Sequence, residues 1–466
     1  MSMCITPGYQ FNSDPTCREI DGRFFLFATQ DPFTEQFRTF NDKFKGMFNY
    51  RAYSTVNFDD WVDHGVLLNS RSTDWHAGTA VWDGDAGIPA NGKFYAYVPF
   101  RRNPDEEDNY GYFEIGVLEA ERPEGPYRDC LGTPMQHPRG GALKGLSPTV
   151  VHDDNGVPHL VWGGGDWKAH HVQIAELDLS MTRLASEPRE IRVQTITEAG
   201  GLEYYESPIL FKRGDTWYLT YIAFKDYGGR NLNFDESDPQ GCYVRYCTSD
   251  SMFGPFNETP RTLVNGLEGN TQQGVCTYRG QWVLAYHRVT PRVEGIPGIH
   301  RRVCVTALEF DADGTPVTVY PEDDPGLGTP EVSRLTLDAY APCRPATDFH
   351  ERRGAHEVEV AFGEYEFAMR TGDFLRFNRV DFGAGPSSVQ AELTPLTERR
   401  KDARLQFRID APDGPLIGEL PATVTGDTAE GGTEPVTGIH DLFVVAAGDT
   451  ANEPLFRLRA FRFQGR

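Results

Sequence analysis

Five segments of the chain repeat one pattern, in which a short strand-like stretch runs into a glycine-centred turn and an aromatic-rich strand. The turns lie at Gly22, Gly92, Gly156, Gly214 and Gly280, which are 58 to 70 residues apart. Alternating apolar residues on both sides of each turn favour strands. A repeat of roughly 60 residues built from several short strands is typical of a β-propeller blade. The sequence therefore predicts five blades around one axis.

The composition changes after the fifth repeat. Residues 321–330 are polar and rich in proline and glycine, and such a stretch does not form a packed core. Strand-like alternation resumes near His356 and continues to the C-terminus, for example in Leu455–Phe463. We therefore predict an all-β protein with a five-bladed β-propeller at residues 1–340 and a β-sandwich of jelly-roll type at residues 341–466.

The charge and the cysteine content narrow the possible partners and location. The 466 residues carry a formal net charge of −23, which argues against binding to nucleic acid or to an anionic membrane, whereas a neutral sugar fits. Eight cysteines include no Cys-x-x-Cys pair, which argues against a zinc site. The first eight residues have neither a basic start nor an apolar run, so we expect no signal peptide and a cytoplasmic location.

The first strand of each blade points one end at the propeller axis, and polar residues occur there. Aligned by the following glycine, four repeats place Asp14, Ser147, Glu206 and Gln272 eight or nine residues before the turn, while the second repeat brings residues 77–79. Two carboxylates that face each other across a cleft are the catalytic groups of glycoside hydrolysis. One protonates the leaving oxygen, and the other activates water or attacks the anomeric carbon. The alternative is that they only cap strand ends.

Aromatic side chains near these positions offer flat apolar faces. Trp75 and Trp82 lie before the second repeat's turn, and Tyr204 and Tyr205 precede Glu206. Stacking on a sugar ring and packing in the core both explain any single one of them. We take Trp75 as the candidate substrate-binding residue.

Several motifs occur in a fixed order along the chain. They are Asp14-Pro15, Asn49–Gly65, Ser147–Gly156, Glu206–Gly214, Tyr286-His287-Arg288, Gly298–Cys304 and Phe310–Gly314. In this order they resemble the successive blade signatures of glycoside hydrolase family 43. The likeness covers nearly all of the first 320 residues. It is specific for the family but not for a substrate.

The resemblance implies an inverting enzyme that acts on arabinofuranosyl or xylosyl groups. Asp14 would be the general base and Glu206 the general acid, with their carboxyl groups roughly 6.5–9.5 Å apart to admit a water molecule. His287 would be the axial histidine beneath the sugar, which in such enzymes sometimes lies beside a bound Ca²⁺ or water. Arg301 would be the arginine directed at sugar hydroxyls, although Arg302 is adjacent.

Ser147 departs from the family pattern, which has an aspartate at this position that tunes and orients the general acid. A serine supplies no negative charge, so it cannot raise the pKa of the acid by repulsion. Three readings follow. Asp74, Asp83 or Asp85 supplies the charge, desolvation keeps Glu206 protonated, or catalysis is weak or lost.

The C-terminal region resembles carbohydrate-binding module family 6. The likeness is carried by Gly372–Gly383, Ile409–Gly418 and Gly438–Phe443. Such modules often hold a structural Ca²⁺ between an early glutamate pair, here Glu357 and Glu359, and a late Asp-Trp, where this chain has Arg459-Ala460. The loop at residues 446–453 has no aromatic residue to stack on a glycan. We expect a packing or shielding role for this region.

These observations together predict the activity. The leading hypothesis is an exo-acting α-L-arabinofuranosidase that removes single residues from arabinose-containing oligosaccharides. The alternatives are a β-D-xylosidase on xylose-containing oligosaccharides and a non-catalytic sugar-binding protein. We expect no required cofactor beyond a possible structural Ca²⁺. The predicted substrate-binding residues are Trp75, Ser147, Gln272, His287 and Arg301.

Overall fold

The computed structural model of the chain is built from β-strands. It describes residues 11–31, 47–76, 81–101, 113–163, 172–191, 203–224, 241–256, 261–268, 272–289, 301–321, 324, 326–330, 333–361, 364–396, 402–422, 428–449 and 453–465. Regular structure in these residues is strand apart from one 3-10 turn, η2 (Ala346–Asp348), which confirms the predicted all-β class. No helix in them has the length and apolar character needed to cross a membrane.

Two compact units divide the chain. One contains Phe11–Tyr50 and Leu68–Thr329, and the other contains Arg51–Leu67 and Pro330–Arg466. The sequence placed one boundary near residue 340, and it did not anticipate that Arg51–Leu67 groups with the C-terminal part. The domain boundaries at residue 340 stay a prediction.

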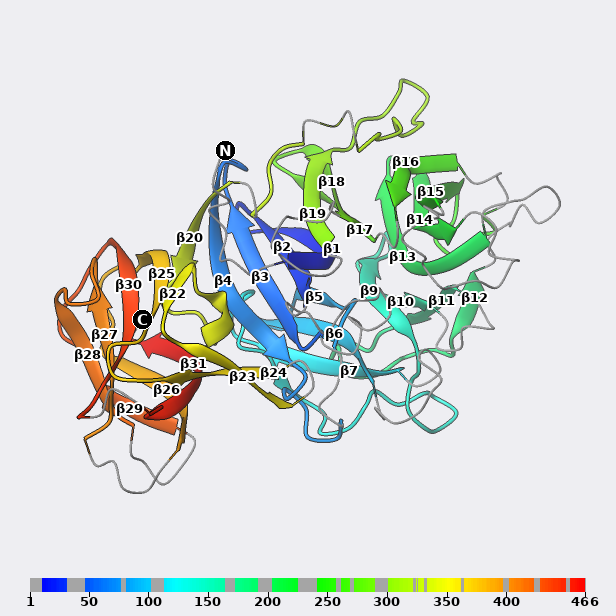
Figure 1. Cartoon of the computed structure of the whole chain (residues 1–466). Coiled ribbons are helices and arrows are strands. Elements are labelled where there is room, and N and C mark those ends of the chain that lie inside the picture. Colours follow the sequence, from blue (N-terminus) through cyan, green and yellow to red (C-terminus); the bar gives the residue numbers. More distant parts are fainter. Residues whose placement is uncertain are drawn as a thin grey trace. The chain divides into compact units, whose positions relative to one another are not determined.

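Successive antiparallel sheets form the blades of the first unit (Figure 1). Blade one begins with β1 (Phe11–Ile20) and β2 (Arg23–Asp31). Blade two has β5 (Asp85–Ala90), β6 (Lys93–Arg101), β7 (Phe113–Ala120) and β8 (Arg128–Asp129). Blade three has β9 (Leu146–His152), β10 (Pro158–Gly163), β11 (Val172–Glu176) and β12 (Arg189–Ile191). Blade four has β13 (Glu203–Arg213), β14 (Thr216–Phe224), β15 (Gly241–Ser249) and β16 (Arg261–Glu268), and blade five has β17 (Gln273–Tyr278), β18 (Gln281–Val289) and β19 (Arg301–Ala307).

The innermost strands close into a ring. β1 contacts β5, β5 contacts β9, β9 contacts β13, β13 contacts β17, and β17 returns to β1. At the closure β17 approaches β1 so closely that a Cβ on Gly274 would lie 2.8 Å from the backbone of Pro15 and Thr16. Only glycine fits there, because real Cβ contacts are longer. The ring confirms the predicted propeller.

Apolar side chains fill the space between neighbouring blades. Tyr97 of blade two and Trp162 of blade three belong to one buried cluster. Leu219 of blade four packs with Val161 of blade three in a second cluster, and Tyr286 of blade five packs in a third. The sheets of blades three and four therefore bury apolar side chains on both faces, which holds their inner strands in fixed positions around the axis.

The second unit contains two sheets. One contains β4 (Asp60–Asn69), which pairs in parallel with β20 (Arg334–Asp338), and continues through β25 (Phe374–Asp381), β30 (Ile439–Ala447), β27 (Arg404–Ile409) and β28 (Leu416–Pro421), with β22 (Glu351–Arg353) on β25. The hairpin partner of β4 is β3 (Asn49–Thr55). The other sheet has the order β23 (His356–Ala361), β24 (Glu364–Met369), β31 (Phe456–Gln464), β26 (Ser388–Pro395) and β29 (Thr428–Gly432), with β21 (Arg344–Pro345) on β31.

Phenylalanines form the core of this unit. Phe407 of β27 packs against Phe461 and Phe463 of β31, with ring centroids 5.6 and 5.5 Å apart. Phe377 of β25 meets Phe461 at 5.1 Å. These contacts join residues of the two sheets, as a β-sandwich requires.

A buried ionic network lies within the same unit. Arg51 of β3 donates to Asp63 of β4 at 2.8 Å and to Asp348 of η2 at 2.9 Å, and all three side chains are fully buried. Arg344 of β21 also binds Asp63 at 2.8 Å. Two guanidinium groups therefore balance two carboxylates, and each charge depends on the others because water does not reach them.

We expect Asp63→Asn to lower the free energy of unfolding by about 3 kcal/mol, because the change leaves two buried arginines facing one carboxylate. Urea unfolding followed by circular dichroism measures the effect. The matched control is Glu187→Gln at the exposed Arg139–Glu187 pair, where the side chains are 77% and 51% exposed; there we expect a change below roughly 1 kcal/mol. Equal effects of the two substitutions would contradict the importance of the network.

Candidate active site

Three inner strands begin with the same local structure. Asp14-Pro15, Ser147-Pro148 and Ser207-Pro208 each lie where the register to the neighbouring strand slips. Asp14, Ser147 and Ser207 have φ angles of 51°, 51° and 60°, in the left-handed region. Proline donates no hydrogen bond to a ladder, so it fits at such an irregularity. The slip in register changes the direction of the side chain before the proline. Strained backbone of this kind clusters at functional sites.

The structure revises the sequence alignment in blade four, and in blade two Asp83 has the same backbone conformation. Asp83, with φ 58°, holds the left-handed position at the start of blade two. The sequence had proposed residues 77–79 there, and they lie outside the described residues. In blade four the equivalent of Asp14 and Ser147 is Ser207, so Glu206 lies one residue before that position. The alignment counted back from the turn glycine, and it could not account for the slip in register.

Asp14, near the start of β1, makes hydrogen bonds through its backbone N–H and through both carboxylate oxygens. Its side chain is 3% exposed. Its backbone N–H donates to Nδ1 of His287 at 2.9 Å, and its Oδ1 accepts from Nη1 of Arg301 at 3.0 Å. Ser13 donates to Oδ2 at 3.1 Å. These contacts fix the orientation of the carboxylate and favour its ionised form.

Arg301 joins Asp14 to a second carboxylate, Asp31 at the end of β2. Nη2 of Arg301 donates to Asp31 at 2.6 Å, and the backbone N–H of Arg301 donates to the same carboxylate at 3.1 Å. Burial alone would lower the pKa of Arg301, but the charges of Asp14 and Asp31 outweigh it and raise this pKa above its ordinary value. The guanidinium therefore stays charged in a fully buried place. Its described contacts make it a positioning residue for Asp14, and direct contact with a substrate stays a prediction.

The contact with Asp14 fixes the tautomer of His287. Because Nδ1 accepts a hydrogen bond from a backbone N–H, the ring proton lies on Nε2. The imidazole is fully buried on β18, and its own backbone N–H donates to the carbonyl of Gln272 at 3.2 Å. His287 thus holds the backbone of Asp14 in its left-handed conformation. Its predicted place beneath the sugar stays a prediction.

Asp83 is the buried carboxylate that faces Ser147. The hydroxyl of Ser147 donates to Oδ2 of Asp83, and the side chain of Gln272 makes a further hydrogen bond to Asp83. Burial raises the pKa of Asp83 well above its ordinary value, and the charges of Asp14 and Glu206 raise it further, while the two hydrogen bonds act against this. Of the three carboxylates considered from the sequence, Asp83 is the one that interacts with both predicted catalytic residues.

Glu206 lies on β13 opposite Ile222, and only 8% of the residue is exposed. Its charge acts on Asp83 in blade two and on Arg301 in blade five. The charge of Asp14 also raises the pKa values of Asp83 and Arg301. Asp14 and Glu206 therefore belong to one buried electrostatic cluster, although they come from blades one and four.

The described contacts of Trp75 are with other residues of blade two. Its indole N–H donates to Asp129 of β8 at 2.7 Å, and its ring packs edge-on against Phe100 of β6. The side chain is half-buried against the outer strands of blade two. The contacts described above join six of the seven predicted site residues, namely Asp14, Ser147, Glu206, Gln272, His287 and Arg301. Substrate binding by Trp75 stays a prediction.

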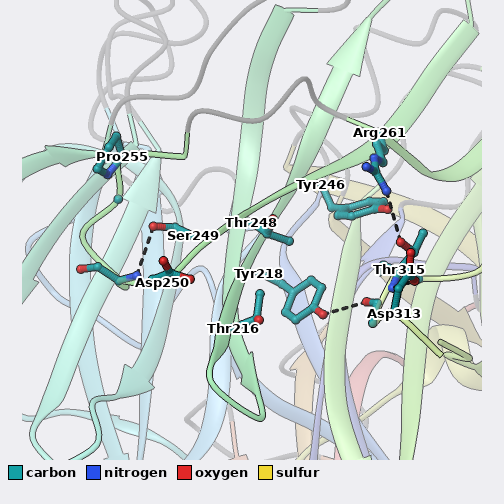
Figure 2. Close-up of a pocket in the computed structure, with 14 residues that line it drawn as sticks. Thr216, Tyr218, Tyr246, Thr248, Ser249, Asp250, Pro255, Arg261, Asp313 and Thr315 are labelled. Carbon is teal, nitrogen blue, oxygen red and sulfur yellow. Dashed lines mark hydrogen bonds between the residues drawn. The ribbon is translucent and has the colours of Figure 1, made fainter. Parts of the chain in front are cut away.

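A separate cavity of about 680 Å³ lies among the outer strands of blade four and residues 313–316 (Figure 2). Its lining is rich in hydroxyl groups, and Tyr218 donates to the carbonyl of Gly314 at 2.7 Å. Both of its acidic residues, Asp250 and Asp313, are exposed. This cavity therefore lacks the buried acid pair that glycoside hydrolysis needs.

The described residues do not fit the Ca²⁺ site that the C-terminal resemblance implied. Glu357 and Glu359 are exposed on β23. Arg459 donates to the buried carboxylate of Glu366 at 2.6 Å, so a guanidinium group neutralises the acid in this region. The described part of the chain contains no group of three or more histidine, cysteine, aspartate or glutamate residues arranged to hold a metal ion.

Sequence reasoning missed Asp31 and Ser13. Asp31 lies 270 residues from Arg301 in sequence, and only the closed ring brings them together. Ser13 donates to both Asp31 and Asp14. A weak signal was present, because Ser13 directly precedes the Asp-Pro motif. No pattern in the sequence linked Asp31 to it.

The arrangement separates two kinds of carboxylate. Asp14 faces a permanent cation, so it is suited to accept a proton from water. Burial raises the pKa of Asp83 in the same cluster, and the charge of Glu206 raises it further. Carboxylates from different blades in one buried cluster are the groups that acid–base cleavage of a glycoside requires.

Comparison with known proteins gives a family and several relatives. Residues 8–316, more than half of the chain, match Glycosyl hydrolases family 43, and residues 360–465 match the carbohydrate binding module (family 6). The arabinoxylan arabinofuranohydrolase of Bacillus subtilis (strain 168) is 24% identical over 98% of this chain and 91% of its own length. A xylosidase/arabinosidase of Bacteroides ovatus is 26% identical over 69% of this chain and 98% of its own.

A solved structure shows the same fold. The crystal structure of a family 43 arabinoxylan arabinofuranohydrolase from Bacillus subtilis in complex with cellotetraose has a TM-score of 0.53 and 22% sequence identity. The match covers 100% of this chain and 100% of that one. At this identity the likeness supports the architecture of both units.

Because its pKa is raised, Asp83 is expected to lower the free energy of unfolding at neutral pH. The folded state binds this proton more tightly than the unfolded chain, so stability is lost as the pH rises through the folded pKa. We expect Asp83→Asn to raise the free energy of unfolding at pH 7 by roughly 1–2 kcal/mol, with the gain vanishing near pH 4. Denaturant unfolding at both pH values measures it, with Asp154→Asn at a 68% exposed side chain as the control. A loss of stability at pH 7 would contradict the assignment.

Proposed function

Because the chain belongs to glycoside hydrolase family 43, we propose that this glycosidase is inverting and exo-acting and removes α-L-arabinofuranosyl residues from arabinose-containing oligosaccharides. The proposal rests on the pair of buried carboxylates Asp14 and Glu206, which come from different blades. The charges of both raise the pKa values of Asp83 and Arg301. A single water molecule between such a pair is the arrangement of an inverting glycosidase.

The two acids have different parts in the reaction. Asp14, kept ionised by Arg301 and oriented by His287, takes a proton from the attacking water. Glu206 gives its proton to the oxygen of the leaving group, which departs as an alcohol. The water oxygen bonds to the anomeric carbon from the face opposite the leaving group, so the configuration inverts. These steps use water and the side chains of this chain.

The arabinofuranosyl group is proposed from the relatives. The arabinofuranohydrolase of Bacillus subtilis aligns with almost all of this chain, including its C-terminal part. The second candidate substrate is a β-D-xyloside, which the name of the Bacteroides ovatus xylosidase/arabinosidase supports. One propeller accommodates several specificities, so the choice depends on an activity measurement.

We expect the wild-type protein to release nitrophenol from the α-L-arabinofuranoside with a kcat/KM roughly tenfold or more above that for the β-D-xyloside, because the two sugars differ in ring size and hydroxyl placement. Initial rates with both nitrophenyl glycosides measure this. A reversed order favours the xylosidase. Binding of pentoses by calorimetry without hydrolysis of either glycoside would support a sugar-binding protein instead.

Substitutions at the two acids separate their roles. We expect Glu206→Gln to lower kcat on an arabino-oligosaccharide by roughly 10²–10⁴-fold with little change in KM. The loss should be smaller with the nitrophenyl glycoside, because nitrophenolate leaves without help from an acid. Asp14→Asn should lose activity equally on both substrates, because water attacks in both. Steady-state kinetics of the two variants on the two substrates provide the comparison.

Two outcomes would contradict these roles. Equal losses for Glu206→Gln on both substrates would remove it as the general acid. Proton NMR of the first product would remove the water-activating role of Asp14 if the anomeric configuration is retained.

A further inference from the structure

Blade five meets blade one where the ring closes, and among the described strands none of blade five pairs with a strand of blade one. β17 nevertheless lies directly beside β1, because Gly274 approaches the backbone of Pro15 and Thr16. Further along both strands, the backbone N–H of Arg279 donates to the carboxylate of Glu19 at 3.0 Å. The two strands therefore run in the same direction, and the seam between them is held without a shared ladder.

Cys17 of β1 lies between these two contacts, and its side chain points toward blade five. The next residue, Arg18, points the other way, because it is paired with Asp85 of blade two and donates to the carbonyl of Ala86 at 3.0 Å. Successive side chains of a strand alternate between its two faces. The Cys17 residue is only 5% exposed, so its thiol is buried in the seam.

Cys276 of β17 points into the same seam from the opposite side. The preceding residue, Val275, packs in the buried cluster that contains Phe211 of blade four. Tyr278, on the same face of β17 as Cys276, reaches blade one, where its hydroxyl donates to the carbonyl of Gly22 at 3.3 Å. In contrast to Cys17, Cys276 is partly exposed.

The two thiols interact across the seam. Burial raises the pKa of the Cys17 thiol well above its ordinary value, and a hydrogen bond with the side chain of Cys276 raises this pKa further. Both cysteines are free thiols in this structure. A disulfide needs two side chains that face each other at close range, and the closure of the ring provides this arrangement.

We propose that Cys17 and Cys276 are an oxidisable pair whose disulfide closes the propeller ring covalently. The bond joins the first blade to the last. Asp14 spans the same seam, because His287 accepts from its backbone N–H and Arg301 donates to its carboxylate from blade five. Oxidation of the pair therefore fixes the junction on which the position of Asp14 depends.

A small-molecule disulfide supplies the oxidising equivalents. Cys276 reacts first, because it is partly exposed: its thiolate attacks the small disulfide, forms a mixed disulfide and releases one small thiolate. The Cys17 thiol then loses its proton, and its sulfur attacks the sulfur of Cys276 and releases the second small thiolate. Both released thiolates take up the protons that the cysteines lost. The second step is slow, because burial disfavours the Cys17 thiolate.

The first experiment treats the folded, full-length protein with oxidised glutathione. Remaining thiols are then alkylated, and the protein is digested without reductant and analysed by mass spectrometry. Digestion with trypsin and chymotrypsin separates Cys17 from Cys4, because Tyr9 and Phe11 lie between them. We expect glutathione bound to Cys276 at early times and then a fragment that links Cys17 to Cys276 and disappears on reduction.

Two results overturn the proposal in a protein that stays folded by circular dichroism. One is that no linked fragment forms. The other is that glutathione remains on Cys276 in the wild type, since the thiol of Cys17 then does not reach it.

Variants test the order of the two steps. Cys17→Ala should retain glutathione on Cys276, because the second thiol is missing, and Cys276→Ser should form no mixed disulfide at this seam. The matched control is Cys130→Ser, which removes a partly exposed thiol of blade two and should form the linked fragment as the wild type does. Mixed disulfide on Cys17 in folded Cys276→Ser would contradict the order of attack.

Thermal unfolding tests whether the bond closes the ring. We expect oxidation to raise the Tm of the wild type by roughly 5 °C or more, because the disulfide constrains the unfolded chain over a long loop. Calorimetry at a fixed scan rate measures the Tm before oxidation, after oxidation and after subsequent reduction. Cys276→Ser should show no rise after the same treatment. An unchanged Tm in wild type that contains the linked fragment would overturn the role of the bond in holding the seam.

Discussion

A single buried guanidinium group organises the centre of the propeller. Arg301 of blade five binds Asp14 and Asp31 of blade one, with all three side chains almost fully removed from water. Breaking one partner would leave an unpaired buried charge, so the contact couples the closure of the ring to the ionisation of Asp14. The same interaction therefore serves the fold and the chemistry. His287, which holds the Asp14 backbone, comes from the strand that precedes Arg301.

The blades present one backbone position with different side chains. Asp14, Asp83, Ser147 and Ser207 all adopt the left-handed conformation at the start of an inner strand. The choice of aspartate or serine at each blade sets where negative charge lies around the axis. The chain has carboxylates on blades one and two and hydroxyls on blades three and four. Glu206, one residue before Ser207, adds its carboxyl from blade four. The pattern of charge thus depends on the side chains, while the backbone stays the same.

The sequence was informative where the signal is local and repeated. The glycine turns predicted the blades. Asp14 and Glu206, singled out from the sequence, lie in one buried cluster, and their catalytic roles stay predictions. The sequence was less informative where the strand register determines which residue occupies the left-handed position. The slip before Thr16 and before Ile209 cannot be counted from residue types, so the equivalence of Ser207 and the blade-two position of Asp83 were missed. Asp31 was missed because its partner is brought near only by ring closure. Trp75 was singled out for its ring, although its indole N–H is satisfied by Asp129.

The most direct test is a crystal structure of Glu206→Gln with an arabinose-containing oligosaccharide bound. The anomeric carbon is predicted to lie between residues 14 and 206, with the two side-chain carbonyl carbons roughly 6.5–9.5 Å apart and one water molecule beside Asp14. A separation of roughly 5–5.5 Å would indicate a retaining mechanism. A sugar bound only in the cavity near Tyr218, away from Asp14, would contradict the proposed site altogether.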